Sequence, residues 1–207
     1  MTMEAIIFDL DGTLWDACEN TAKAWNEYIT HFCPDTHVNV TVESLASCMG
    51  LRLREFGARI FTDVDEDRAM EIGLACAEYE NHYLAEHGAI IYPGVPEALE
   101  SLSKKYKLFI VSNCESGYIE TFLQYYHLEE YITDTMCPGD TGKDKAENIQ
   151  LIMEKNQLKQ AVYVGDTQKD YDEATRAGVP FIWAAYGFGE VSGTKRIEDV
   201  RELEEML

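Results

Sequence analysis

The strongest constraint on the fold is an apolar stretch near the N-terminus that ends in two carboxylates. Residues 5–8 are all apolar, and Asp9, Asp11 and Gly12 come immediately after them. Four apolar residues can form one buried strand, and a glycine lets the backbone bend where that strand ends. Two carboxylates this close repel each other, so a cation, a shared proton or solvent must lie between them. Taken alone, the pattern also fits a surface Asp-Gly turn, so its meaning depends on the rest of the chain.

The periodicity of the chain changes after residue 88. Apolar residues recur at intervals of three and four throughout residues 16–88, which is typical of helices, and a break follows at residues 92–96. Helices are then predicted over 96–105, 117–126, 146–157, 170–177 and 197–207, and strands over 107–112, 131–136, 161–165 and 180–185. Repeated strand, helix and strand units favour an α/β fold, with a parallel sheet covered by helices on both faces.

The composition narrows the classes of partner. The 207 residues include 17 Lys and Arg against 38 Asp and Glu, a formal net charge of −21. Such a charge repels nucleic-acid backbones and anionic lipids, so we expect no nucleic acid and no membrane as partners. No leader precedes the first strand and no apolar run is long enough to span a membrane, which favours a cytoplasmic protein. The six cysteines form no Cys-x-x-Cys pair and suit reduced thiols.

Polar residues follow three of the predicted strands at their carboxyl ends. Asp9 ends the first strand, Ser112 and Asn113 end the second, and Asp166 follows the fourth. Ligands of parallel sheets gather at this edge, so these side chains should face one crevice. A hydroxyl and free amides before a helix bind phosphate well, although a Ser-Asn turn would show the same residues.

Two further segments supply a cation and more carboxylate. Lys143 and Lys145 lie just before the start of a predicted helix. A lysine that reached the crevice would neutralise a carboxylate and a phosphoryl group. The alternative is a solvated lysine in a surface loop. Gly165 permits close backbone approach, and Asp170 lies one turn beyond Asp166. Oxygen ligands that converge from two loops suit Mg²⁺, while the alternative makes Asp170 a helix N-cap.

Together these segments resemble the haloacid dehalogenase (HAD) superfamily of phosphatases and phosphotransferases. The run Asp9 to Thr13 matches its first motif, Ser112 its second, Lys143 or Lys145 its third, and Gly165 to Asp170 its fourth. The resemblance covers nearly the whole chain and all four motifs occur in the family's order. It implies a Rossmann-like core domain, residues 1–15 and 89–207, with a small all-helical cap domain, residues 16–88, inserted after the first strand.

The resemblance also implies catalytic roles. Asp9 would attack phosphorus and become a transient aspartyl-phosphate, and Asp11 would protonate the leaving oxygen and then deprotonate water. Mg²⁺ would be bound by Asp9, the backbone carbonyl of Asp11 and Asp166, with Asp170 in support. Dehalogenases resemble this fold but lack the second aspartate, so Asp11 favours phosphate-ester chemistry.

The remaining roles concern the substrate. Ser112 and the amide of Asn113 would bind the phosphoryl oxygens. Lys145 is the expected catalytic lysine, because it opens directly into a helix, and Lys143 is its rival and a candidate for substrate binding. Gly50 and Arg52 fall where capped relatives carry a substrate-specificity loop, although an exposed arginine on an amphipathic helix is an equal interpretation.

The predicted function is a Mg²⁺-dependent phosphatase, similar to phosphoglycolate phosphatases, that acts on a small phosphorylated metabolite through an aspartyl-phosphate. One alternative is a phosphotransferase of the β-phosphoglucomutase type, and another is a non-catalytic phosphoryl-binding module. Phosphoglycolate, sugar phosphates, nucleoside monophosphates and pyrophosphate all fit the motifs. The motifs leave the oligomeric state open, and they assign no role to Cys114, which lies beside Asn113.

Overall fold

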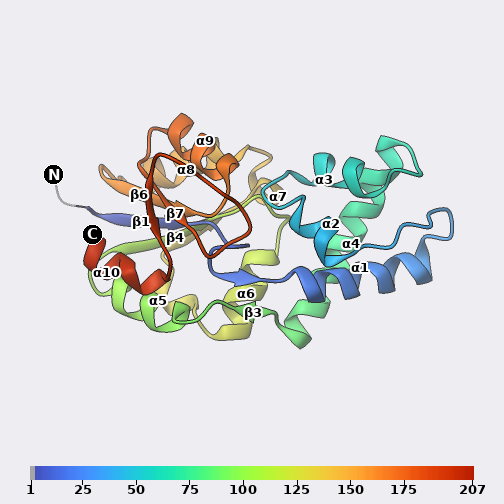
Figure 1. Ribbon diagram of the computed structural model, residues 1–207, viewed down its shortest axis with the longest axis horizontal. Coiled ribbons are helices and arrows are strands. Elements are labelled where there is room, and N and C mark those ends of the chain that lie inside the picture. The colour runs from blue at the N-terminus through green and yellow to red at the C-terminus, as the bar shows by residue number, and fades with distance from the viewer. Residues whose placement is uncertain (1–2) are drawn as a thin grey trace.

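The structure, a computed structural model, describes residues 3–207, in which a six-stranded sheet forms the centre (Figure 1). The strand order is β5-β4-β1-β6-β7-β8, and every neighbouring pair is parallel. The strands are β1 (Ala5–Phe8), β4 (Lys107–Val111), β5 (Asp134–Met136), β6 (Ala161–Gly165), β7 (Phe181–Ala184) and β8 (Lys195–Ile197). The predicted α/β fold with a parallel, Rossmann-like sheet is confirmed.

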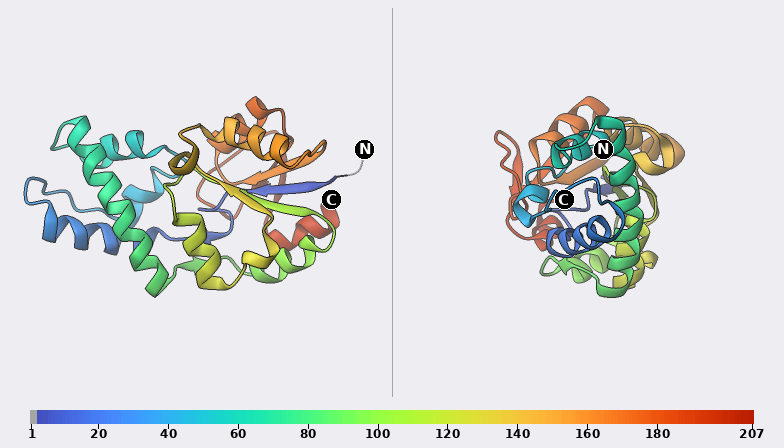
Figure 2. Two further views of the ribbon diagram at one scale, coloured as in Figure 1. Left: turned by 180° about the vertical axis from the view of Figure 1, so that it is seen from behind. Right: turned by 90° about the vertical axis from the view of Figure 1, so that its right-hand side faces the viewer.

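Side chains of β1 alternate between two hydrophobic clusters, one on each face of the sheet. Ile6 and Phe8 pack with α5 (Val95–Ser103), α6 (Tyr118–Tyr126) and α10 (Leu203–Met206). Ala5 and Ile7 pack with α8 (Lys145–Lys155) and α9 (Gln168–Ala177) on the other face. Helices therefore cover both faces, as Figure 2 shows, which is why the central strands read as continuous apolar runs.

A third hydrophobic cluster lies among helices at one end of the molecule (Figure 1). These helices are α1 (Cys18–Phe32), α2 (Val42–Ala46), α3 (Leu53–Ile60) and α4 (Glu66–His87). The helical cluster joins the sheet through two short strands, β2 (Trp15–Asp16) and β3 (Ile90–Ile91), which pair antiparallel. The helical character of this segment agrees with the sequence pattern, and its division from the core at residues 16 and 88 stays a prediction.

The prediction of a C-terminal helix over 197–207 is wrong. Lys195–Ile197 form the edge strand β8, a 3-10 turn follows at Val200–Glu202, and only Leu203–Met206 are α-helical. Ile197 is completely buried and pairs with Ala184 of β7, so tertiary burial decides its conformation. The sequence pattern also missed α7 (Pro138–Thr141) and the β2–β3 pair. Among residues 3–207, no helix has the length and apolarity of a membrane span.

Candidate active site

Asp9 lies immediately beyond the end of β1, at the centre of the sheet edge. Its backbone N–H donates to the carbonyl of Val164 in β6 at 2.8 Å, which keeps it in the sheet's register. Gly12 turns the chain away with a φ of +77°, and a Cβ there would lie 2.1 Å from Oδ2 of Asp166. Only glycine allows this turn to pass so close to the next strand end.

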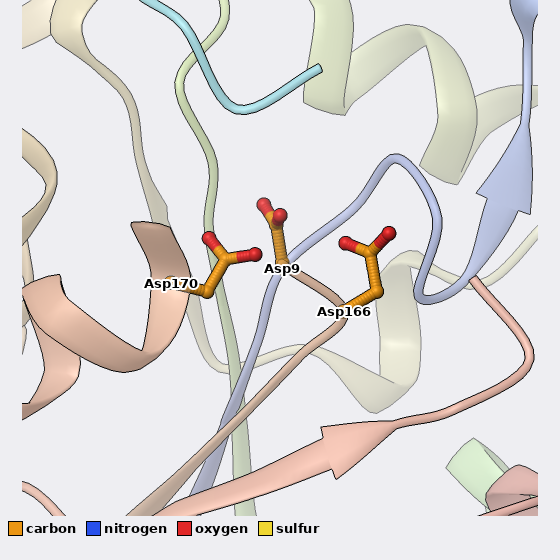
Figure 3. A group of neighbouring side chains, drawn as sticks. All are labelled: Asp9, Asp166 and Asp170. Carbon is orange, nitrogen blue, oxygen red and sulfur yellow. The ribbon is translucent and has the colours of Figure 1, made fainter. Parts of the chain in front are cut away.

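Three aspartates converge at the strand ends (Figure 3). Asp9, Asp166 and Asp170 each place one carboxylate oxygen within 4.8 Å of the other two. Asp170 is held by Thr167, whose N–H and hydroxyl donate to its Oδ2 at 3.0 and 2.6 Å. The N–H of Phe188 donates to Oδ2 of Asp166 at 2.7 Å. Thr167 is the N-cap of α9, and Asp170 is the third residue of the helix rather than its N-cap.

A buried lysine joins this carboxylate cluster. The Nζ of Lys145 lies 2.6 Å from Oδ1 of Asp170 and 3.0 Å from Oδ1 of Asp9. Burial opposes the charged form of Lys145, but the carboxylates of Asp170 and Asp9 outweigh it and raise its pKa well above the ordinary value. Lys143 instead lies at the surface, with its Nζ 3.6 Å from Oε1 of Glu147. The geometry therefore places Lys145, and not Lys143, against the strand-end carboxylates.

The carboxylate cluster fits a divalent cation. Three carboxylates face one ammonium, and burial together with the Asp170 charge raises the pKa of Asp9 to about 6. Burial likewise raises the pKa of Asp166 well above its ordinary value. Oδ1 of Asp166 is buried and, within residues 3–207, has no hydrogen-bond partner. A hard cation such as Mg²⁺ would satisfy this oxygen and offset the excess negative charge.

Asp11 lies in a different environment from Asp9. Its Oδ1 accepts a hydrogen bond from the hydroxyl of Tyr118 at 2.8 Å, and its carboxylate is not part of the carboxylate cluster. Burial raises the pKa of Asp11 to about 8, against the effect of this hydrogen bond. The group can therefore carry a proton near neutral pH, as a general acid must. Tyr118 was not predicted from the sequence.

A cavity of about 90 Å³ lies between the strand ends and the helical cluster. From the strand ends and the loops beside them it is lined by Asp9, Asp11, Ser112, Asn113, Cys114, Glu115, Tyr118 and Lys145, and from the helical cluster and its loops by Thr21, Trp25, Cys48, Met49, Gly50, Leu51, Leu53, Phe56, Ala77, Glu80 and Asn81. Nδ2 of Asn113 donates to the carbonyl of Gly50 at 2.8 Å, which ties the two sides together. The structure thus brings most of the predicted residues to one cavity.

Arg52 and Lys143 do not line this cavity. Arg52 is the N-cap of α3 and lines an adjoining hollow, and its Nη2 lies 3.5 Å from the carbonyl of Gly142. Their part in substrate binding stays a prediction.

Glu80 is a cavity residue that the sequence analysis missed. It lies on α4, is only 6% exposed, and accepts hydrogen bonds from Thr21 Oγ1 at 2.6 Å and Trp25 Nε1 at 2.8 Å. Burial raises its pKa to about 7. A signal was available, because Glu80 falls at the fourth position after Cys76 and before Leu84, on the buried stripe of the helix.

The parallel sheet with aspartates and a buried lysine at its strand ends defines an α/β enzyme core. The chain matches the family model of haloacid dehalogenase-like hydrolases over residues 6–184, and it belongs to that family. It is 27% identical to a phosphoglycolate phosphatase of Aquifex aeolicus over 195 residues, 90% of this chain and 86% of that protein. It is 29% identical to a phosphoglycolate phosphatase of Agrobacterium fabrum over 208 residues, 94% and 85% of the two chains.

A solved structure supports the same fold. A haloacid dehalogenase-like hydrolase of Streptococcus pneumoniae has a TM-score of 0.82 at 22% identity, covering 99% of this chain and 98% of that one. The predicted membership of the HAD superfamily, the likeness to phosphoglycolate phosphatases and the prediction of an enzyme are therefore confirmed.

Proposed function

We propose that this protein is a Mg²⁺-dependent phosphatase that hydrolyses a small phosphorylated metabolite through an aspartyl-phosphate. The observation that carries the proposal is the buried Asp9 carboxylate, which lines the cavity beside Lys145 and belongs to the carboxylate cluster. Membership of the hydrolase family and the likeness to phosphoglycolate phosphatases support a phosphate ester as the substrate.

Asp9 and Asp11 divide the reaction between them. An oxygen of Asp9 bonds to phosphorus while the bond from phosphorus to the ester oxygen breaks, and Asp11 gives its proton to that oxygen. In the second half, Asp11 takes a proton from the water that attacks the aspartyl-phosphate, which restores both side chains. Their separate surroundings support these roles, since Asp9 faces a lysine and Asp11 faces a hydroxyl.

The other residues bind and orient the phosphoryl group. Ser112 and the backbone amide of Asn113 donate to its oxygens, and Lys145 offsets the charge of Asp9 and the phosphoryl group. Asp9, Asp166, the backbone carbonyl of Asp11 and, in support, Asp170 would bind Mg²⁺, which supplies positive charge to the phosphoryl oxygens.

The helical cluster acts as the cap in this proposal. Residues 16–88 form the cap domain, and residues 1–15 and 89–207 form the core. The separate hydrophobic cluster of the helices and the cavity between the two parts support this division. A cap of this kind limits the access of water and selects the leaving group.

The proposal is tested with purified protein and a generic aryl phosphate. Phosphate release should need Mg²⁺, stop with a chelator, and fall by about 10³-fold or more in Asp9→Asn, because the nucleophile is lost. Asp172→Asn serves as a matched control, since Asp172 is exposed on α9 and does not line the cavity. Full activity in Asp9→Asn contradicts the mechanism. Isomerisation that requires a bisphosphate would indicate the phosphotransferase, and a stable aspartyl-phosphate without turnover would indicate the binding module.

A further inference from the structure

The cap side of the cavity contains a buried carboxylate that the proposed reaction does not use. Both oxygens of Glu80 accept hydrogen bonds, but the donors, Thr21 and Trp25, are neutral. Within residues 3–207, no lysine or arginine forms an ion pair with Glu80. Burying a carboxylate without a cation is costly, so its position in a cavity wall calls for a ligand that supplies the missing charge.

Two more acceptors line the same cavity, one on the cap side and one on the strand-end side. Asn81 and Asn113 both line the cavity, and their Nδ2 atoms donate to the carbonyls of Ser116 at 2.9 Å and Gly50 at 2.8 Å. These bonds fix which end of each amide is the oxygen. In the described chain both Oδ1 atoms are buried and have no hydrogen-bond partner. Each therefore needs a donor from outside the protein.

The positive charge in the cavity lies on the opposite side. Of the described residues that line it, Lys145 alone is a lysine or arginine, and Asp9 and Asp170 already engage its ammonium. Glu115, in the loop after β4, adds another acid to the cavity lining. A leaving group with a carboxylate, such as glycolate, would bring its negative charge towards acceptors and acids, and among the described lining residues it would find no unpaired lysine or arginine.

We propose that Glu80 binds a protonated amine on the leaving group, so that the substrate is the phosphate ester of a short amino alcohol. The amine would also donate hydrogen bonds to the free Oδ1 atoms of Asn81 and Asn113. A cavity of about 90 Å³ holds roughly six to nine water-sized groups, enough for a chain of two or three carbons with its phosphate. This inference rests on the proposed phosphatase activity at Asp9.

Three two-carbon phosphate monoesters that differ only at the far end test the proposal. They are O-phosphoethanolamine with an ammonium, 2-hydroxyethyl phosphate with a hydroxyl, and phosphoglycolate with a carboxylate. We expect kcat/KM with Mg²⁺ to be roughly tenfold higher for the ammonium ester than for the hydroxyl ester, and roughly a hundredfold higher than for the carboxylate ester.

Two glutamates of α4 give a matched pair of variants. Glu80→Gln should lower kcat/KM for the ammonium ester by roughly ten- to a hundredfold, because the amine loses its counter-charge. The ratio of kcat/KM between the ammonium ester and the carboxylate ester should therefore fall. Glu78→Gln, at an exposed position of the same helix, should change none of the three values.

The outcomes separate the two proposals. A wild-type preference for phosphoglycolate, or an equal effect of Glu80→Gln on all three esters, overturns the amine site and leaves the phosphatase intact. Failure to release phosphate from any of the esters and from the aryl phosphate overturns the phosphatase itself, and the amine site with it.

Discussion

The two walls of the cavity both bury acids, but they stabilise them in different ways. At the strand ends, Asp9 and Asp170 share the ammonium of Lys145, and backbone and hydroxyl donors hold the carboxylates in place. On the cap side, Glu80 has two neutral donors and, among the described residues, no ion-pair partner. At the strand ends, the ammonium of Lys145 therefore provides a counter-charge for the carboxylates. On the cap side, the charge of the Glu80 carboxylate is left for a bound ligand to balance.

The largest expected effect comes from replacing Lys145, because the strand-end side of the cavity then loses its own counter-charge. In Lys145→Met the carboxylates of Asp9 and Asp170 lose their partner, and loss of one member of a buried ion pair costs about 3–5 kcal/mol of unfolding free energy. Among the described residues, the Nζ of Lys143 pairs only with exposed Glu147, so Lys143→Met should change the free energy of unfolding by less than about 0.5 kcal/mol. Chemical denaturation without Mg²⁺ measures both. Equal losses in the two variants would refute the assigned role of Lys145.

The second expected effect is a pH dependence of the unfolding free energy that comes from the buried carboxylate of Glu80. Its pKa is raised from 4.5 to about 7 in the folded protein, so the folded state holds this proton more tightly than the unfolded chain does. The resulting stability is fully present below pH 4.5 and is lost as pH rises through 7. Glu80→Gln removes this dependence.

Relative to wild type, the unfolding free energy of Glu80→Gln should therefore gain roughly 2–3 kcal/mol between about pH 5 and pH 8. Denaturant titrations at the two pH values measure the difference, and Glu78→Gln is the control for a change of glutamate on the same helix. A difference that does not depend on pH would mean that Glu80 is already ionised and stabilised at neutral pH.

The smallest expected effect concerns the hydroxyl of Tyr118, which donates to Asp11. Tyr118→Phe removes the donor to Oδ1 of Asp11, a bond of 2.8 Å, and the loss of one hydrogen bond of about 1 kcal/mol lowers kcat roughly fivefold. Tyr125→Phe, at an exposed position of the same helix, should leave kcat unchanged. Initial rates on the aryl phosphate measure kcat for both variants. Identical rates for the two variants would mean that the Tyr118 hydroxyl has no role in the reaction.

The strand-end residues could be predicted because topology alone brings them together. A parallel sheet places the carboxyl ends of its strands at one edge, so Asp9, Ser112 and Asp166 converge wherever the helices lie. Lys145 could be favoured over Lys143 from its place at the helix entry, but the pattern does not show which ammonium is buried. The structure makes that distinction, since Lys145 is 1% exposed.

The cap residues could not be predicted in this way, because the docking of one helix on another is a tertiary property. Arg52 lies in the adjoining hollow rather than in the cavity, and the sequence pattern does not show this difference; its part in substrate binding stays a prediction. Glu80 is a charged residue within an otherwise apolar buried stripe, and this is visible in the sequence only when the stripe is traced residue by residue. The edge strand β8 was missed because its first two residues, Lys195 and Arg196, are charged and exposed.

The antiparallel pair of β2 and β3 has a mechanical consequence. The chain enters and leaves the helical cluster along these two adjacent strands, and Trp15 at the core end packs edge-on against Tyr118 and Phe122. Any rotation of the helices must therefore bend both strands about one common hinge. Such a rotation would carry Glu80 and Gly50 away from Asp11 together, so the two ends of a bound ester would be released in a single movement.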